Sequence, residues 1–198
     1  MKAEGASENR GLTVKFRDGT VVPAVGQGSA GLAQGRHAAA DEEEALRTGL
    51  SLGMTLIDTS GNYGEGRSEE LIKRVIAGQR DRAFLVSKVE ANDVTGSAMA
   101  RACEASLARL GTDHLDLYLL HWPTPNAQFS EAVAGFESLR AAGKIRAWGV
   151  SNFSVPQMKA LFRIPQGDRC ATNQVPYSIG DRAIERDLLP WWSCTVCR

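Results

Sequence analysis

Short apolar runs alternate with longer amphipathic stretches along most of the chain. The apolar runs are rich in Val, Ile and Leu and span only a few residues, which predicts strands that are buried on both faces. The amphipathic stretches have helical spacing, and several end at a glycine, a common residue at helix ends. The predicted strands are 14–16, 21–25 (continuing to 28), 54–58, 83–88, 115–121, 144–151 and 171–175, and the predicted helices are 41–52, 69–77, 98–110, 129–142, 155–162 and 182–189.

The spacing of these strands predicts a repeated βα unit. Strand ends fall near positions 28, 58, 88, 121, 151 and 175, so the unit recurs about every 30 residues. Such a repeat is typical of an α/β fold with a parallel sheet. Two layouts fit, a doubly wound open sheet and a closed (β/α)8 barrel, and the apolar runs supply only six of the eight units that a barrel needs. The first two runs flank Asp18-Gly19, which predicts an N-terminal β-hairpin.

Composition narrows the possible functions by exclusion. The 198 residues carry 23 basic and 23 acidic side chains, so the chain lacks the basic surplus of a nucleic-acid-binding protein. No apolar run approaches the ~20 residues of a membrane-spanning helix, and Met1–Arg10 lacks the apolar stretch of a secretion signal. We therefore expect a cytoplasmic protein that forms a single domain over residues 1–198. The Cys194-x-x-Cys197 motif has no second ligand pair, so we expect no metal site.

Polar side chains stand at the ends of five predicted strands, in Asp58, Lys88, His121, Ser151 with Asn152, and Gln174. Because the carboxyl ends of parallel strands meet on one face, we expect these side chains to share a rim. Among them, Ser151, Asn152 and Gln174 can be interpreted in two ways. They either shape turns or bind a carboxamide such as that of nicotinamide.

Tyr63 follows Asp58 by five residues and completes a candidate proton-donor site. A phenol has a pKa of about 10, and a nearby ammonium group lowers that pKa toward the range useful for proton donation. We predict that Lys88 lowers the pKa of Tyr63, that Asp58 holds Lys88 charged, and that His121 donates a hydrogen bond to a carbonyl oxygen. Such a site suits carbonyl reduction, and it requires a cofactor because it supplies no hydride.

Gly26-x-Gly28-x-x-Gly31 has the form of a dinucleotide-binding fingerprint. That fingerprint requires a helix to begin at once, whereas residues 32–40 are predicted to form a loop. We therefore reject a doubly wound dinucleotide-binding sheet and interpret these glycines as a tight loop that a ligand can approach closely.

Several motifs together resemble the aldo/keto reductase family, in particular its bacterial branch. They are Gly53–Thr59 with Tyr63-Gly64, Val86–Lys88, Leu115–Pro123, Gly143–Arg146, Gly149–Phe153 and Asn173–Val175. The resemblance implies a (β/α)8 barrel whose N-terminal hairpin closes the bottom. It also implies NADPH-dependent reduction of a small aldehyde or ketone to an alcohol, by a protein that is usually monomeric.

The resemblance also implies a role for each candidate residue. Tyr63 would be the general acid, Lys88 and Asp58 the pair that tunes its pKa, and His121 the donor that orients the carbonyl group. The cofactor NADPH would contact Asp58, Gly28, Ser29, Ser151, Asn152 and Gln174, and the substrate would contact Trp122.

The chain departs from the family after Trp191, where two further βα units are expected. We expect an incomplete barrel, truncated near residue 190, and we hypothesise that a shifted reading frame produced the last residues. Open strand edges and an uncovered apolar interior would favour self-association and weaken the binding of NADPH. Three functions therefore remain: a carbonyl reductase, a catalytically impaired fragment of one, or a non-enzymatic binding subunit on the same scaffold. A binding subunit would not need the four proton-donor residues.

Overall fold

The computed structural model describes residues 12–94, 97–123 and 129–196, so Met1–Arg10 and Cys197 lie outside the described residues. A six-stranded parallel sheet forms the centre of the fold, and its strands follow one another in chain order. A doubly wound sheet would instead reverse its strand order at a switch point, so this order is that of a barrel wall. The strands are β3 (Gln27–Gly28), β4 (Leu56–Asp58), β5 (Phe84–Val89), β6 (Leu115–Leu120), β7 (Ile145–Ser151) and β8 (Asn173–Gln174).

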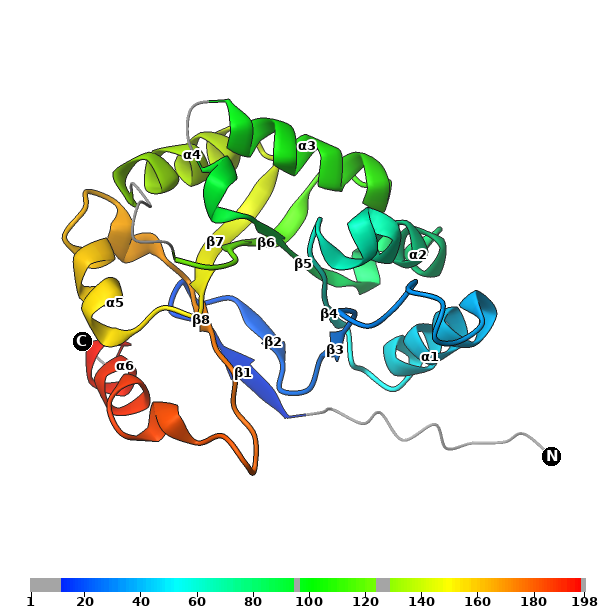
Figure 1. Cartoon of the computed structure of the whole chain (residues 1–198), viewed down its shortest axis with the longest axis horizontal. Helices are drawn as coiled ribbons and strands as arrows, with labels where there is room; N and C mark the ends of the chain where they lie inside the picture. Colours follow the sequence, from blue (N-terminus) through cyan, green and yellow to red (C-terminus); the bar gives the residue numbers. More distant parts are fainter. Residues whose placement is uncertain (1–11, 95–96, 124–128, 197–198) are drawn as a thin grey trace.

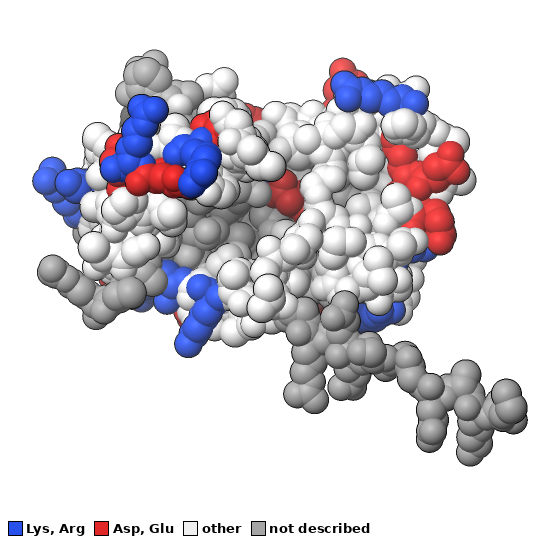
Figure 2. All heavy atoms as spheres, turned by 90° about the horizontal axis from the view of Figure 1, so that it is seen from below, with Lys and Arg blue, Asp and Glu red and all other residues white. Residues whose placement is uncertain are grey.

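The sheet curls into an incomplete barrel with helices on its convex side (Figure 1). Five helices each follow one strand, and a sixth ends the described part of the chain. Figure 2 shows the concave side of the molecule as a recess. The prediction of an incomplete (β/α)8 barrel is confirmed. The helices are α1 (Ala39–Ser51), α2 (Arg67–Ile76), α3 (Ala98–Leu110), α4 (Phe129–Ala141), α5 (Val155–Phe162) and α6 (Leu188–Val196).

The main core lies between the sheet and the outer helices. Trp148 of β7 is 1 % exposed and stacks on Phe136 of α4, with ring centroids 5.1 Å apart. Tyr118 of β6 meets the same Phe136 ring edge-on at 6.0 Å. Apolar burial of this kind contributes about 25 cal/mol per Å2 of buried surface, so these aromatic pairs anchor α4 against two neighbouring strands.

The N-terminal hairpin covers the inner face of the sheet. β1 (Thr13–Lys15) and β2 (Val21–Pro23) pair antiparallel, as predicted. The Phe16 side chain packs against a second apolar cluster, and the backbone N–H of Arg17 donates to the carbonyl of Ala171 at 3.3 Å. The prediction of an uncovered apolar interior is therefore wrong. The buried members of this inner cluster, which are at most 7 % exposed, are Val86, Leu117, Leu119, Ala147 and Ala171.

The prediction of one helix over residues 182–189 is wrong. Instead, η5 (Ala183–Glu185) forms a single 3-10 turn, and α6 begins only at Leu188. Arg182 pairs with Glu185 at 2.9 Å and closes the turn locally. Pro190 falls within the first turn of α6, where a missing N–H costs no helical hydrogen bond, so the helix continues through it to Val196.

Replacing Gly149 by Ala should lower the free energy of unfolding by about 1–3 kcal/mol, the usual range for overpacking. A Cβ atom at this position in β7 would lie 2.6 Å from the Thr172 carbonyl oxygen and 2.9 Å from a methyl carbon of Leu119. Gly31→Ala is the control, because the nearest atom to its Cβ would be 3.8 Å away. Urea unfolding measures both variants, and equal stability of the two would contradict the packing described for β7.

Burial raises the pKa of the Cys103 and Cys170 thiols to about 12, whereas Cys194 is exposed. The thiolate is the reactive form, so iodoacetamide at about pH 8 should modify Cys194 and spare the two buried thiols until urea is added. Because the folded pKa of Cys170 lies above its ordinary value of 9.0, its contribution to stability is complete below that pH and is lost as the pH rises toward about 12. Peptide mass mapping tests the protection. Labelling of Cys170 in the native protein at the rate of Cys194 would refute it.

Candidate active site

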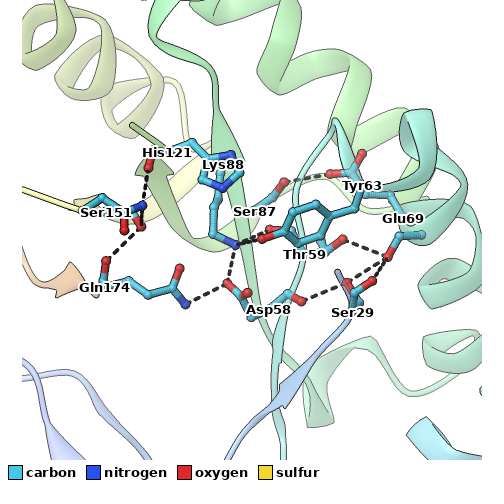
Figure 3. Close-up of polar contacts among 12 residues, drawn as sticks. Ser29, Asp58, Thr59, Tyr63, Glu69, Ser87, Lys88, His121, Ser151 and Gln174 are labelled. Carbon is cyan, nitrogen blue, oxygen red and sulfur yellow. Dashed lines mark hydrogen bonds and ion pairs between the residues drawn. The ribbon is translucent and has the colours of Figure 1, made fainter. Parts of the chain in front are cut away.

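Lys88 lies at the centre of the polar rim (Figure 3). Its side chain rises from the end of β5 and is almost fully buried. The ammonium group donates to Oδ1 of Asp58 at 2.7 Å and to the Thr59 carbonyl at 2.8 Å. A third, longer contact of 3.4 Å joins Nζ to the hydroxyl of Tyr63. Three polar groups thus share one ammonium, because β4 and β5 are adjacent and end at the same face.

Tyr63 reaches this rim from the loop that follows β4. Tyr63 is the first residue of the 3-10 turn η1 (Tyr63–Gly66), in which Gly64 and Glu65 have φ values of 58° and 59°. This left-handed turn sends the chain directly into α2 and leaves the phenol ring over the strand ends. The ring centroid lies 4.9 Å from Nζ of Lys88 and 5.9 Å from the ring centroid of His121.

The prediction that Lys88 lowers the pKa of Tyr63 is wrong for this structure. Burial, followed by the negative charges of Asp58 and Glu90, raises the pKa of the phenol above 10.0. Burial also lowers the pKa of Lys88. The physical reason is that the ammonium makes its short contacts to Asp58 and to a backbone carbonyl, and only a long one to the phenol. The hydroxyl of Tyr63 therefore carries its proton at neutral pH.

Glu90 belongs to this site and was missed from the sequence. Its Oε1 lies 2.6 Å from Nδ1 of His121 and accepts a hydrogen bond of 2.7 Å from the Asn62 side-chain amide. His121 follows β6 directly and is 8 % exposed. The sequence spacing could have indicated Glu90 as a site residue. Lys88 and Glu90 are two residues apart, and strand geometry places such residues on the same face.

The three amide and hydroxyl residues lie together beside Asp58, on the ends of β7 and β8. Ser151 Oγ donates to the Gln174 carbonyl at 2.9 Å, and Gln174 Nε2 donates to Oδ1 of Asp58 at 3.1 Å. Asn152 Nδ2 donates to the His121 carbonyl at 3.1 Å and to Ser151 Oγ at 3.0 Å. Asn152 also shapes the turn after β7, with a φ of 64°. These contacts connect residues that are more than 100 positions apart into one network.

Two candidate cofactor residues, Gly28 and Ser29, lie at the end of β3 and differ in their exposure to solvent. Gly28 is exposed and pairs with Asp58 across β3 and β4, and a side chain built there meets no atom within 4 Å. Ser29 has no exposed surface; its hydroxyl donates to the Asp58 carbonyl at 2.9 Å and accepts from Ser68 at 2.8 Å. Contrary to the prediction, Ser29 therefore supports the rim from behind and does not line it.

Trp122 stands at the outer edge of the site. Its side chain is 51 % exposed, and its ring centroid lies 5.9 Å from that of His121. With Asn152, Val175 and Leu188 it lines an open, largely apolar cavity of about 380 Å3. The position is suited to contact with the apolar part of a small molecule.

The sequence profile of the aldo/keto reductase family matches residues 24–194. The chain belongs to this family. It is 48 % identical over 178 residues to methylglyoxal reductase YeaE of Escherichia coli, a match that covers 90 % of this chain and 62 % of that protein. It is 37 % identical to the aldo-keto reductase YhdN of Bacillus subtilis, over 75 % of this chain and 47 % of the relative.

Solved structures of the family share this fold. An aldo-keto reductase from Klebsiella pneumoniae in complex with NADPH superposes with a TM-score of 0.88 at 47 % identity, covering 94 % of this chain and 65 % of the other. The same comparison with a complex of NADP and acetate gives a TM-score of 0.87. This chain therefore spans less than two thirds of the length of these relatives.

Among residues 12–94, 97–123 and 129–196, no helix combines the length and apolar character needed to cross a bilayer. Within the same ranges, no three His, Cys, Asp or Glu side chains come together in a way that could hold a metal ion.

Proposed function

We propose that this chain carries the proton-donor rim of an enzyme that reduces aldehydes and ketones to alcohols, with a hydride from NADPH and a proton from Tyr63. The observation that carries the proposal is the convergence of Tyr63, Lys88, Asp58 and His121 on one face. The Tyr63 hydroxyl lies 3.4 Å from Nζ of Lys88, which in turn lies 2.7 Å from Asp58. A non-enzymatic binding subunit has no need of a buried, charged pair behind a phenol.

The residues present fit the carboxamide of a nicotinamide ring. Asn152 Oδ1 and Gln174 Oε1 accept no hydrogen bond within the described part of the chain, while both donors of the Asn152 amide are already used. These two oxygens can accept the carboxamide N–H groups, and the second N–H of Gln174 can donate to the carboxamide oxygen. When bound, NADPH supplies the hydride that no side chain can provide.

In the proposed reaction the hydride adds to the carbonyl carbon and the Tyr63 hydroxyl protonates the carbonyl oxygen. Tyr63 is suited to this step because its raised pKa keeps the proton on the phenol until negative charge develops on the substrate oxygen. The Lys88 ammonium then stabilises the phenolate that remains. Asp58 holds that ammonium in place, and His121, whose ring centroid lies 5.9 Å from that of Tyr63, binds the substrate oxygen.

The test is the oxidation of NADPH, followed by absorbance, with methylglyoxal and a panel of simple aldehydes. A fluorescence titration with NADPH is run on the same protein. Oxidation that requires both carbonyl compound and protein supports the proposal. Binding of NADPH without oxidation would favour a binding subunit, and absence of both would favour a catalytically impaired fragment.

A further inference from the structure

Glu90 connects two parts of the site that the sheet alone does not hold together. Its Oε1 contacts the side chain of Asn62, which immediately precedes Tyr63, at 2.7 Å, and the ring of His121 at 2.6 Å. We propose that Glu90 is a positioning residue that keeps a proton on Nδ1 of His121, so that Nε2 donates to a substrate oxygen only when the ring carries two protons. The effect of Glu90 on turnover rests on the proposed function. The position of the proton on the His121 ring can be measured without turnover.

The chemistry of the contact determines where the proton lies. An ionised carboxylate can only accept hydrogen bonds. The second contact of Oε1 comes from an amide N–H of Asn62, so this oxygen already acts as an acceptor. At 2.6 Å from the same oxygen, Nδ1 of His121 must be the donor, and the short distance is typical of a charge-assisted bond.

A neutral imidazole has one N–H, so a proton on Nδ1 leaves Nε2 as an acceptor. Donation from Nε2 to a carbonyl oxygen then requires a second proton and a positively charged ring. The carboxylate of Glu90 compensates that charge at short range, and its side chain is 36 % exposed against 10 % for His121. The ring thus acts as one half of an ion pair and delivers a stronger donor than a neutral ring would.

Other charged and titratable groups surround this pair. Tyr63 faces the ring from η1, with its hydroxyl next to Lys88 of β5. The Lys88 charge is paired with Asp58 of β4 at 2.7 Å. Behind Glu90, a cavity of about 250 Å3 is lined by side chains that include Asp93 and Arg109. Lys88 already has Asp58 as its carboxylate partner. Glu90 is the carboxylate that contacts the imidazole of His121 directly.

The decisive experiment is 15N NMR of the histidine rings in the unliganded protein across a pH series. The chain has three histidines, and His37 and His114 serve as internal controls for an intact fold. In the wild type we expect the neutral His121 ring to carry its proton on Nδ1. In Glu90→Gln the amide can donate to a bare Nδ1, so the proton of the neutral ring should move to Nε2. Glu90→Ala should also lose the preference for Nδ1.

Two results would overturn the inference. One is a neutral His121 ring that carries its proton on Nε2 in the wild type. The other is a wild-type pattern that survives in both Glu90 variants while His37 and His114 remain unchanged. Either result stands whether or not the protein oxidises NADPH, so failure of the proposed function would be recognised separately.

The pH profile of turnover supplies a second readout. Turnover of the wild type should depend on pH more steeply than turnover of Glu90→Gln, by about tenfold across the profile. The neutral ring of the variant can still donate from Nε2, whereas the wild-type ring needs a second proton to do so. Glu43→Gln is the matched control, since Glu43 pairs with two arginines far from the rim and should leave the profile unchanged. Parallel profiles for wild type and Glu90→Gln would contradict the inference.

Discussion

Replacing Tyr63 by Phe should reduce the carbonyl-dependent oxidation of NADPH by about 100-fold to 10,000-fold, the usual contribution of a positioned general acid. The substitution removes one oxygen atom, the hydroxyl that is proposed to protonate the substrate and that lies 3.4 Å from Nζ of Lys88. Its hydrogen bond to Lys88 is long, at 3.4 Å, so the ammonium keeps its shorter partners. The loss should therefore appear in kcat, with little change in stability or in the dissociation constant for NADPH.

Tyr177→Phe is the matched control for this experiment. Tyr177 is 57 % exposed, and its hydroxyl contacts Glu185 on the surface at 2.6 Å. Its removal should leave both turnover and NADPH binding unchanged. If Tyr63→Phe retains the turnover of Tyr177→Phe, the proton reaches the substrate by another route and the assignment of Tyr63 is incorrect.

Replacing Glu69 by Ala should lower the free energy of unfolding by about 3–5 kcal/mol, the cost of breaking a buried ion pair by removing one partner. The Glu69 side chain has no exposed surface. It accepts from Nε of Arg109 and from the hydroxyl of Ser87, both at 2.7 Å, and so ties α2 to α3 and β5. Without it, the hydroxyl of buried Ser87 loses its acceptor and the guanidinium of Arg109 loses its counter-charge.

Glu70→Ala provides the control from the same helix. Glu70 is the next residue, lies on the exposed side of α2, and should change stability by less than about 0.5 kcal/mol. Urea unfolding with fluorescence detection measures both variants. Similar midpoints for the two would mean that the contacts of Glu69 with Arg109 and Ser87 contribute little to stability.

Much of the fold could be predicted because it depends on periodic patterns. The helices α3 and α5 have the bounds that were predicted, since Gly111 ends one with a left-handed φ of 65° and Ser154 caps the other. The parallel order and the hairpin were also predicted. The bounds of the C-terminal helix were not predicted correctly. The side-chain contacts of Arg182 and the tolerance of Pro190 in a first helical turn outweighed the periodic pattern of residues 182–189.

The candidate site was predictable in its positions but only partly in its energetics. Asp58, Lys88 and His121 meet because neighbouring parallel strands end together, and the sequence contains that information. The direction of the Tyr63 pKa shift depends on whether an ammonium 3.4 Å away outweighs burial and two carboxylates, which only coordinates can decide. Likewise, the burial of Ser29 follows from its partner Ser68 on α2, which no local pattern indicates.

In the proposed reaction, a carbonyl group bound at this rim receives a hydride from NADPH and a proton from Tyr63. The test is mass spectrometry of the alcohol formed from methylglyoxal and NADPH that carries deuterium at both C4 positions. We expect alcohol with one deuterium on the former carbonyl carbon from the wild type and from Tyr177→Phe, and almost no such alcohol from Tyr63→Phe. Absence of deuterated alcohol with the wild type, or equal yields with Tyr63→Phe, would contradict it.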